Sequence, residues 1–239
     1  MALPSLFSFL SDPPPQPGFI VAGIDQSMNH AGMVVLDASG ALIDVAYVTG
    51  KVKEAKAHPN GVVLPTEFKK IQDESLRNAR RMLWWGPIMQ GFLARLQTPL
   101  PVHIAIEDYP LRAAQRAHQM GEVGGRLKNL ILTSAPDVKI RLHGPESVKI
   151  AGAGKGDADK TEMIQAAKDA GFDFSAYGPS ACEDLSDAYF LAELVRLEVR
   201  VRLGTTSLSQ LSENMRRVFL RVTKAHPVNL VDRPWITRS

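Results

Sequence analysis

The first part of the chain alternates short apolar runs with polar turns, a pattern typical of strands. Residues 19–24 form a near-continuous apolar run that ends at Asp25. Residues 30–37 form a second run, and the turn Ala38-Ser39-Gly40 separates it from a third at residues 41–48. Short turns between apolar runs indicate hairpins. We therefore expect three strands in an antiparallel meander, the first of them buried.

Further along the chain, the apolar spacing favours helices. Residues 66–96 carry apolar side chains at helical intervals, with Gly86-Pro87 as a candidate bend or break. Trp84 and Trp85 are expected in or near the core because they bury so much area. The polar segment 51–65 is expected to be a loop. The remaining elements are predicted as strands at 102–106 and 138–142 and helices at 113–133, 147–151, 160–170 and 185–201.

This order of elements predicts an α/β fold. Three hairpin strands followed by alternating helices and strands favour a five-stranded mixed sheet flanked by helices. The order is similar to that of RNase H-like folds. The run Pro-Pro-Pro-Gln-Pro-Gly at residues 13–18 predicts a stiff, extended segment. We therefore divide the chain into a Pro-rich lead-in (1–18), an RNase H-like domain (19–203) and a basic extension (204–239).

Composition narrows the class of protein. The 239 residues are 45% hydrophobic and 22% charged, which is ordinary for a globular protein. No window approaches about 20 uninterrupted apolar residues, and residues 1–19 make a poor signal peptide, so we expect a soluble protein without membrane contact. The single cysteine, Cys182, excludes an intramolecular disulfide and a Cys-rich zinc site, and points to a reducing compartment.

The net charge of +3 means more when it is mapped onto the chain. Residues 196–239 hold nine Lys and Arg against three acids. A basic segment of this kind suits phosphate binding. A solvated helix face is an equally common cause, so both interpretations stay open.

Four acidic residues lie at positions typical of a catalytic or metal-binding site. Asp25 ends the first predicted strand and Glu107 ends the fourth. Asp184 and Asp187 stand at the start of the last long predicted helix, three residues apart and therefore on one face. Acids at strand ends and in first helical turns are often structural. The combination of one acid at each of two strand ends with a pair on a late helix favours a shared site.

Clustered carboxylates repel one another unless cations neutralise them. Hard oxygen ligands suit Mg²⁺ or Mn²⁺. Two such ions can hold a phosphoryl group between the attacking and leaving oxygens. The pattern therefore predicts a site for two Mg²⁺ ions, with Mn²⁺ as a substitute.

Several short motifs occur in an order that resembles one known family. They are Gly23-Ile-Asp25-Gln-Ser27 followed by a hairpin with Gly32, Ala105-Ile-Glu107, the glycine-containing stretch 119–125, Pro145-Glu-Ser-Val-Lys149, and Glu183-Asp-Leu-Ser-Asp187-Ala188. Together they resemble the RuvC family of Holliday-junction resolvases over roughly residues 18–192. Each motif is weak, and the ordered set is specific. The divergent motifs and the added tail look more like phage-encoded members.

The resemblance implies roles for particular residues. Asp25, Glu107, Asp184 and Asp187 would hold the metal ions. Lys149 and Lys160 would contact the scissile phosphate region, with Lys155 as a rival to Lys160. Added basic charge near the metals is expected to stabilise the negative charge of the transition state.

Further contacts with DNA are expected around the second acidic motif. The family places an aromatic residue there that wedges into the junction. Tyr109 could substitute, but Pro110 changes the local backbone. Arg112 and Arg116 could bind phosphates, as could Lys155. The helix with Gly121 and Gly125 would help form a homodimer with two opposed sites, or else these glycines allow tight packing within one chain.

The sequence therefore predicts a dimeric, Mg²⁺-dependent endonuclease. It would hydrolyse phosphodiester bonds in four-way junctions or other branched DNA, as the resemblance implies, and would act in DNA recombination and repair. It is expected in the cytoplasm, that of the host if it is phage-encoded. Two alternatives remain open, a nuclease of the same fold acting on RNA–DNA hybrid and a non-catalytic binder of branched DNA. The four acids weigh against the binder, because clustered negative charge opposes phosphate binding.

Overall fold

The computed structural model describes residues 18–238 apart from Met28, residues 109–113, Pro136 and residues 226–232. For residues 114–120 and 222–225 only the helical backbone is described. The strands are β1 (Ile20–Gln26), β2 (Ala31–Asp37), β3 (Leu42–Thr49), β4 (Gly61–Val63), β5 (Val102–Glu107) and β6 (Lys139–His143). The α-helices are α1 (Val52–Ala55), α2 (Glu74–Ala94), α3 (Ala114–Ser134), α4 (Pro145–Ala153), α5 (Lys160–Asp169), α6 (Pro179–Arg202) and α7 (Glu213–Ala225). Short 3₁₀ helices lie at Thr66–Lys70, Ser175–Tyr177 and Leu208–Gln210.

The strands form a single mixed sheet in the order β4-β3-β2-β1-β5-β6. The hairpins pair β1 with β2 and β2 with β3 in antiparallel fashion, as predicted. The pairs β1–β5, β5–β6 and β3–β4 are parallel. Of the described strands, β2 alone is therefore antiparallel to the others. The order β3-β2-β1-β5-β6 is that of RNase H-like folds, which confirms the predicted fold class.

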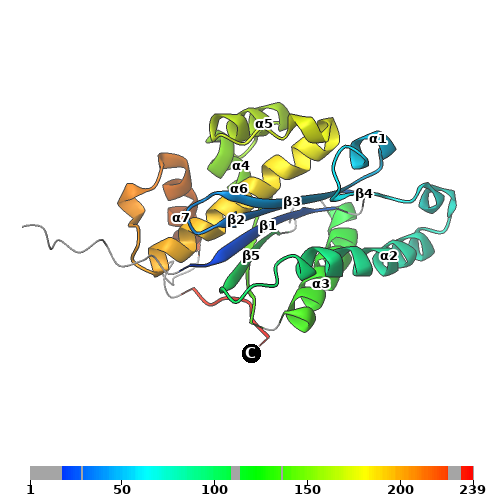
Figure 1. Ribbon diagram of the computed structural model, residues 1–239, viewed down its shortest axis with the longest axis horizontal. Coiled ribbons are helices and arrows are strands. Elements are labelled where there is room, and N and C mark those ends of the chain that lie inside the picture. Colours follow the sequence, from blue (N-terminus) through cyan, green and yellow to red (C-terminus); the bar gives the residue numbers. More distant parts are fainter. Residues whose placement is uncertain (1–17, 28, 109–113, 136, 226–232, 239) are drawn as a thin grey trace, which may run out of the picture.

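Helices cover both faces of the sheet (Figure 1). On one face, α4, α5, α6 and α7 enclose a core that includes Val21, Leu185 and Phe219. On the other face, α2 and α3 cover a core that includes Ile24 and Ile104. Neighbouring residues of β1 thus face opposite cores, as the alternation of a strand requires. Burial on both faces explains why the sequence of β1 is almost continuously apolar.

The predicted number of strands was wrong by one. Residues 51–65 are not a plain loop, because they contain the short helix α1 and the strand β4. β4 pairs with the edge of β3, with Val62 opposite Val48. A strand of three residues is too short to leave an alternating pattern in the sequence, and its pairing partner is distant along the chain.

Two predicted helices have different limits in the structure. The helix expected at residues 66–96 is a 3₁₀ turn followed by α2, which continues through Pro87. Trp85 is buried and Trp84 packs partly exposed against the same core, which agrees with the prediction for both. The helix expected from Leu185 begins at Pro179. Gly178 precedes it with φ of +93°, and proline at the first helical position requires no backbone donor.

The chain beyond α6 packs back against β6 and the end of α6. The backbones of Ile236 and Ile140 exchange two hydrogen bonds of 2.9 and 3.1 Å at the edge of β6. The Trp235 ring lies against two guanidinium groups, 4.2 Å from Arg141 and 4.7 Å from Arg202. None of the described helices is long and apolar enough to cross a membrane.

The contact of α6 with β1 depends on Gly23. A Cβ atom at this position would overlap the Ala188 carbonyl oxygen and lie 2.9 Å from the Leu191 Cβ atom. The two backbones therefore touch, and no side chain separates them. Gly91 on α2 is a useful contrast, because a Cβ atom there would meet nothing within 4 Å.

We predict that Gly23→Ala destabilises the protein by about 1–3 kcal/mol or more, because the helix must move away from the strand. Gly91→Ala should leave stability unchanged or raise it by about 0.5–1 kcal/mol, because it lowers the entropy of the unfolded chain. Urea unfolding of both variants measures the difference. Equal stability of the two would contradict the close packing of α6 on β1.

Candidate active site

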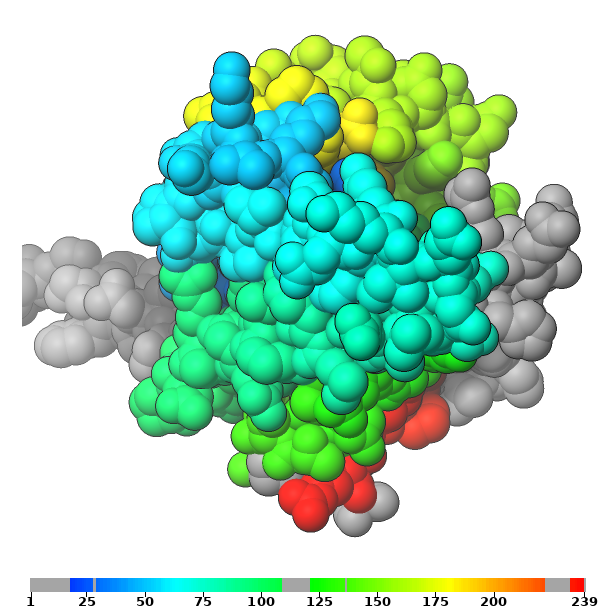
Figure 2. Space-filling model, turned by 90° about the vertical axis from the view of Figure 1, so that its right-hand side faces the viewer, coloured from blue at the N-terminus to red at the C-terminus, as the bar shows by residue number. Residues whose placement is uncertain are grey.

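The four predicted acids come together at one end of the sheet. Asp25 and Glu107 lie at the ends of the parallel neighbours β1 and β5, whose register pairs Ile24 with Ile106. Asp184 and Asp187 lie on α6, which crosses the same strands. Electrostatic interactions link Asp25 with the other three acids. Three elements far apart in the sequence thus supply one carboxylate cluster. Figure 2 views the molecule from the end toward which β1 runs.

A second glycine contact sets the position of Asp184. Gly32 of β2 pairs with Asp25 across the hairpin. A Cβ atom at Gly32 would lie 2.5 Å from the Asp184 carbonyl oxygen and 2.9 Å from the Leu185 nitrogen. The backbone of α6 therefore rests directly on the hairpin beside Asp25. Asp184 and Asp187 were predicted at the start of this helix. Because α6 begins at Pro179, they lie instead in its second and third turns.

Burial and mutual repulsion raise the pKa values of this cluster. Burial raises the pKa of Asp25 well above its ordinary value, and the charges of Glu107, Asp187 and Asp184 raise it further. Burial is also the largest cause of the raised pKa of Asp187, which reaches about 7, with Glu107 and Asp184 adding to it. The pKa values of Glu107 and Asp184 are raised for the same first reason. The fully ionised cluster is therefore unfavourable without added positive charge.

The oxygens of the cluster fit a hard cation. Asp184 Oδ2 and Asp187 Oδ1 are buried and accept no hydrogen bond from the described residues. Buried oxygens without a donor are costly, and Mg²⁺ or Mn²⁺ prefers oxygen ligands of this type. No group of three His, Cys, Asp or Glu side chains in the described residues already has the arrangement of a metal site. The acids would therefore adjust their side chains to hold an ion.

The predicted lysines occupy different surroundings. Lys149 on α4 acts electrostatically on both Glu107 and Asp187, where it lowers their pKa values. Lys160 at the start of α5 forms an ion pair with Glu183 and also interacts with Asp184 and Asp187. Lys155 pairs with Glu162 at 2.6 Å. Of the two candidates for the second basic position, Lys160 is thus the one that interacts with the cluster.

His30 is a member of the site that the sequence analysis missed. Its Nδ1 atom lies 3.7 Å from Asp184 Oδ2, which is ion-pair range but longer than a hydrogen bond. Ser27 fixes the turn that carries it, since the His30 amide donates to Ser27 Oγ at 3.0 Å. Interaction with Asp184 raises the pKa of His30. The sequence did offer one signal for His30, namely its position in the turn between β1 and β2, five residues after Asp25.

Three other predicted DNA contacts lie near the start of α3. Tyr109 and Arg112 lie outside the described residues, and Arg116 belongs to α3 with only its backbone described. Gly125 is exposed on α3, and a Cβ atom there would meet nothing within 4 Å. Tight packing of Gly125 within its own chain is therefore not its role.

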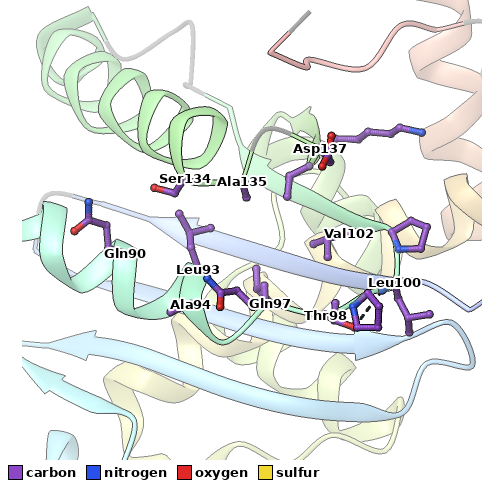
Figure 3. Close-up of a pocket in the computed structure, with 15 residues that line it drawn as sticks. Gln90, Leu93, Ala94, Gln97, Thr98, Leu100, Val102, Ser134, Ala135 and Asp137 are labelled. Carbon is purple, nitrogen blue, oxygen red and sulfur yellow. Dashed lines mark hydrogen bonds between the residues drawn. The ribbon is translucent and has the colours of Figure 1, made fainter.

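A cavity of the described residues lies away from the carboxylate cluster. Its volume is about 650 Å³, and its lining includes Leu93, Leu100, Val102 and Lys139 (Figure 3). Val102 and Lys139 begin β5 and β6, whereas Glu107 ends β5. The cavity therefore lies at the opposite end of the sheet from the carboxylate cluster.

Comparison with known proteins gives matches among solved structures alone. No family model and no curated protein sequence matches the chain. A structure of RuvC from Thermus thermophilus matches with 21% identity and a TM-score of 0.49, over 79% of this chain and 99% of that one. A structure of T. thermophilus RuvC in complex with Holliday junction substrate matches with 21% identity and a TM-score of 0.48, over 79% and 98% of the two chains. Both are RuvC proteins, the family that the sequence motifs resemble.

We predict that the metal-free protein loses stability as the pH rises from about 4 to about 7. Over this window folded Asp187, with its pKa raised from 3.8 to about 7, keeps a proton that the unfolded chain has released. The free energy of unfolding then falls by at most about 1.4 kcal/mol per pH unit for this group. Asp187→Asn should be less sensitive to pH.

Urea unfolding in EDTA at several pH values tests this expectation. Asp137→Asn is the matched control, because Asp137 is exposed near the opposite end of the sheet. It should keep the wild-type pH profile. A profile for Asp187→Asn that also follows the wild type would show that Asp187 does not carry the raised pKa.

Proposed function

We propose that the protein is a metal-dependent endonuclease that cleaves four-way junctions or related branched DNA. The observation that carries the proposal is the convergence of Asp25, Glu107, Asp184 and Asp187 with Lys149 and Lys160 beside them. A binding protein gains nothing from four acids next to phosphate, whereas a phosphodiester hydrolase needs them to hold cations. The ordered RuvC-like motifs suggest branched DNA as the substrate.

The four acids are the proposed ligands of two Mg²⁺ ions, which Mn²⁺ could replace. When bound, these ions would activate the attacking water and stabilise the leaving oxygen. Asp184 Oδ2 and Asp187 Oδ1 are buried and accept no hydrogen bond from the described residues, so they are the oxygens most in need of a cation. Asp25 and Glu107 would supply further carboxylates from the ends of the neighbouring strands β1 and β5.

The lysines would act on the substrate. The positive charge of Lys149 partly offsets the raised pKa values of Glu107 and Asp187, so Lys149 lies close enough to act on two of the proposed metal ligands. We propose that it stabilises the negative charge that builds up in the transition state. Lys160 would contact the phosphate after exchanging its exposed pairing with Glu183, since an exposed ion pair is weak.

We further propose that the protein acts as a homodimer. The exposed Gly125 on α3 supports this, because a small residue on an open helix face allows another helix to approach closely. Two copies related by a two-fold axis would present two sites to symmetrically opposed strands. Cuts at symmetric positions on two strands of one junction would be the corresponding product.

We predict that the wild-type protein nicks a labelled four-way junction in Mg²⁺ and leaves the matching linear duplex intact. Asp25→Asn should lower nicking at least about 100-fold, because the site loses a charged ligand, while junction binding persists. Asp137→Asn, with its exposed side chain distant from the cluster, should cleave like the wild type. Denaturing electrophoresis of end-labelled strands measures all three.

Other outcomes would contradict the proposal. An intact junction with wild-type protein in both Mg²⁺ and Mn²⁺ would exclude a resolvase. Cleavage of an RNA–DNA hybrid in place of the junction would assign the site to a different substrate. Nicking that survives in Asp25→Asn would exclude the carboxylate cluster as the catalytic site.

A further inference from the structure

Two sets of arginines in the C-terminal part of the chain have different surroundings. Arg196 forms an ion pair with Glu193, and Arg202 pairs with the buried Glu198 at 2.9 Å. The charges of these arginines are compensated by ion pairs within the fold. The same holds for Arg141, which forms a buried ion pair with Glu198. The second set lies on α7, where Arg216, Arg217 and Arg221 are exposed.

The other face of α7 anchors the helix rigidly. Met215, Val218 and Phe219 are buried against the core that α4 and α6 share. α7 packs along α4 in the antiparallel direction, because Arg217 contacts Gly154 at the end of α4 and Arg221 contacts Glu146 at its start. The exposed arginines therefore project from a fixed helix.

Two of these arginines keep a usable positive charge. Arg217 donates a hydrogen bond of 2.8 Å to the Gly154 carbonyl oxygen. A carbonyl group orients the guanidinium but leaves its charge uncompensated, and other donors of the fork stay available. Among the described residues, no acid lies within ion-pair distance of Arg216. Arg221 differs, since Glu146 pairs with it at 2.5 Å.

α4 connects this surface with the carboxylate cluster. Lys149 on α4 acts on Glu107 and Asp187, and α7 covers the flank of the same helix. From Glu146 to Gly154 the axis of α4 rises about 12 Å, which corresponds to about four base pairs of duplex. α7 therefore lies beside the helix that carries Lys149, on the same face of the sheet as α6 with Asp184 and Asp187.

We propose that the exposed face of α7, defined by Arg216 and Arg217, is a second DNA-binding surface that holds the phosphate backbone of one duplex arm. The inference rests on the proposed function for the orientation of the DNA. Its chemistry is a match of charge, since each contact between an arginine and a phosphate releases condensed counterions. The surface reads no bases, so it adds affinity without sequence preference.

The test compares DNA binding of Arg216→Gln/Arg217→Gln with that of the wild type. The full-length protein is titrated against a fluorescent four-way junction and a linear duplex in EDTA, and anisotropy is followed at several salt concentrations. We expect binding about 10-fold weaker at low salt. The slope of log affinity against log salt should fall by nearly 2, because two phosphate contacts are lost.

Two control variants make the result specific. Lys139→Gln removes an exposed charge at the start of β6, at the far end of the sheet, and should bind like the wild type. Arg217→Lys keeps the charge but loses the guanidinium bond to Gly154, and should also stay within about 2-fold of the wild type. Thermal unfolding of each variant checks that the fold is kept.

The inference and the proposed function fail separately in this design. Wild-type affinity and slope in Arg216→Gln/Arg217→Gln would overturn the α7 surface even if the protein cleaves junctions. The surface would also be overturned if Lys139→Gln lost as much DNA affinity per removed charge as the double variant. Such a result would show that net charge alone determines binding. If Arg216→Gln/Arg217→Gln binds more weakly while both control variants bind like the wild type, the result would support the surface even if no DNA is cleaved.

Discussion

The close contact between α6 and the β1–β2 hairpin is the constraint on which the site depends. Gly23 and Gly32 leave no space for a Cβ atom where α6 crosses the two strands. The Gly32 contact is with the backbone of Asp184 itself. The same glycines that bring helix and hairpin together therefore set the height of Asp184 and Asp187 above Asp25. A change in this packing would alter the geometry of all four acids.

The carboxylate cluster lowers the stability of the metal-free fold at neutral pH. Burial and mutual repulsion raise the pKa values of Asp25 and Asp187. Ionising these acids therefore costs more free energy in the folded protein than in the unfolded chain. The hydrophobic cores on both faces of the sheet offset this cost. Divalent cations would remove the repulsion, which couples metal binding to the stability of the fold. The same cations would also offset the repulsion between the four acids and a phosphate group.

Much of this architecture follows from local pattern. The hairpin strands, the parallel strands β5 and β6 and most helices were predictable because apolar runs and helical spacing are local properties. β4 was not, since a three-residue strand depends on the distant edge of β3. The early start of α6 at Pro179 depends on Gly178 and not on apolar spacing. The proximity of the four acids was predicted, whereas the contacts of His30 with Asp184 and of Lys160 with Glu183 arise from tertiary packing.

The most direct test of the central claim is a count of bound Mn²⁺ by electron paramagnetic resonance, with the metal titrated against the wild type and against Asp184→Asn/Asp187→Asn. If the four acids form one two-metal site, the wild type should bind two ions per chain, and the double variant should lose at least one of them. Equal binding by the two proteins would contradict the account, because it would place the metal ions away from the acids that α6 brings to Asp25 and Glu107.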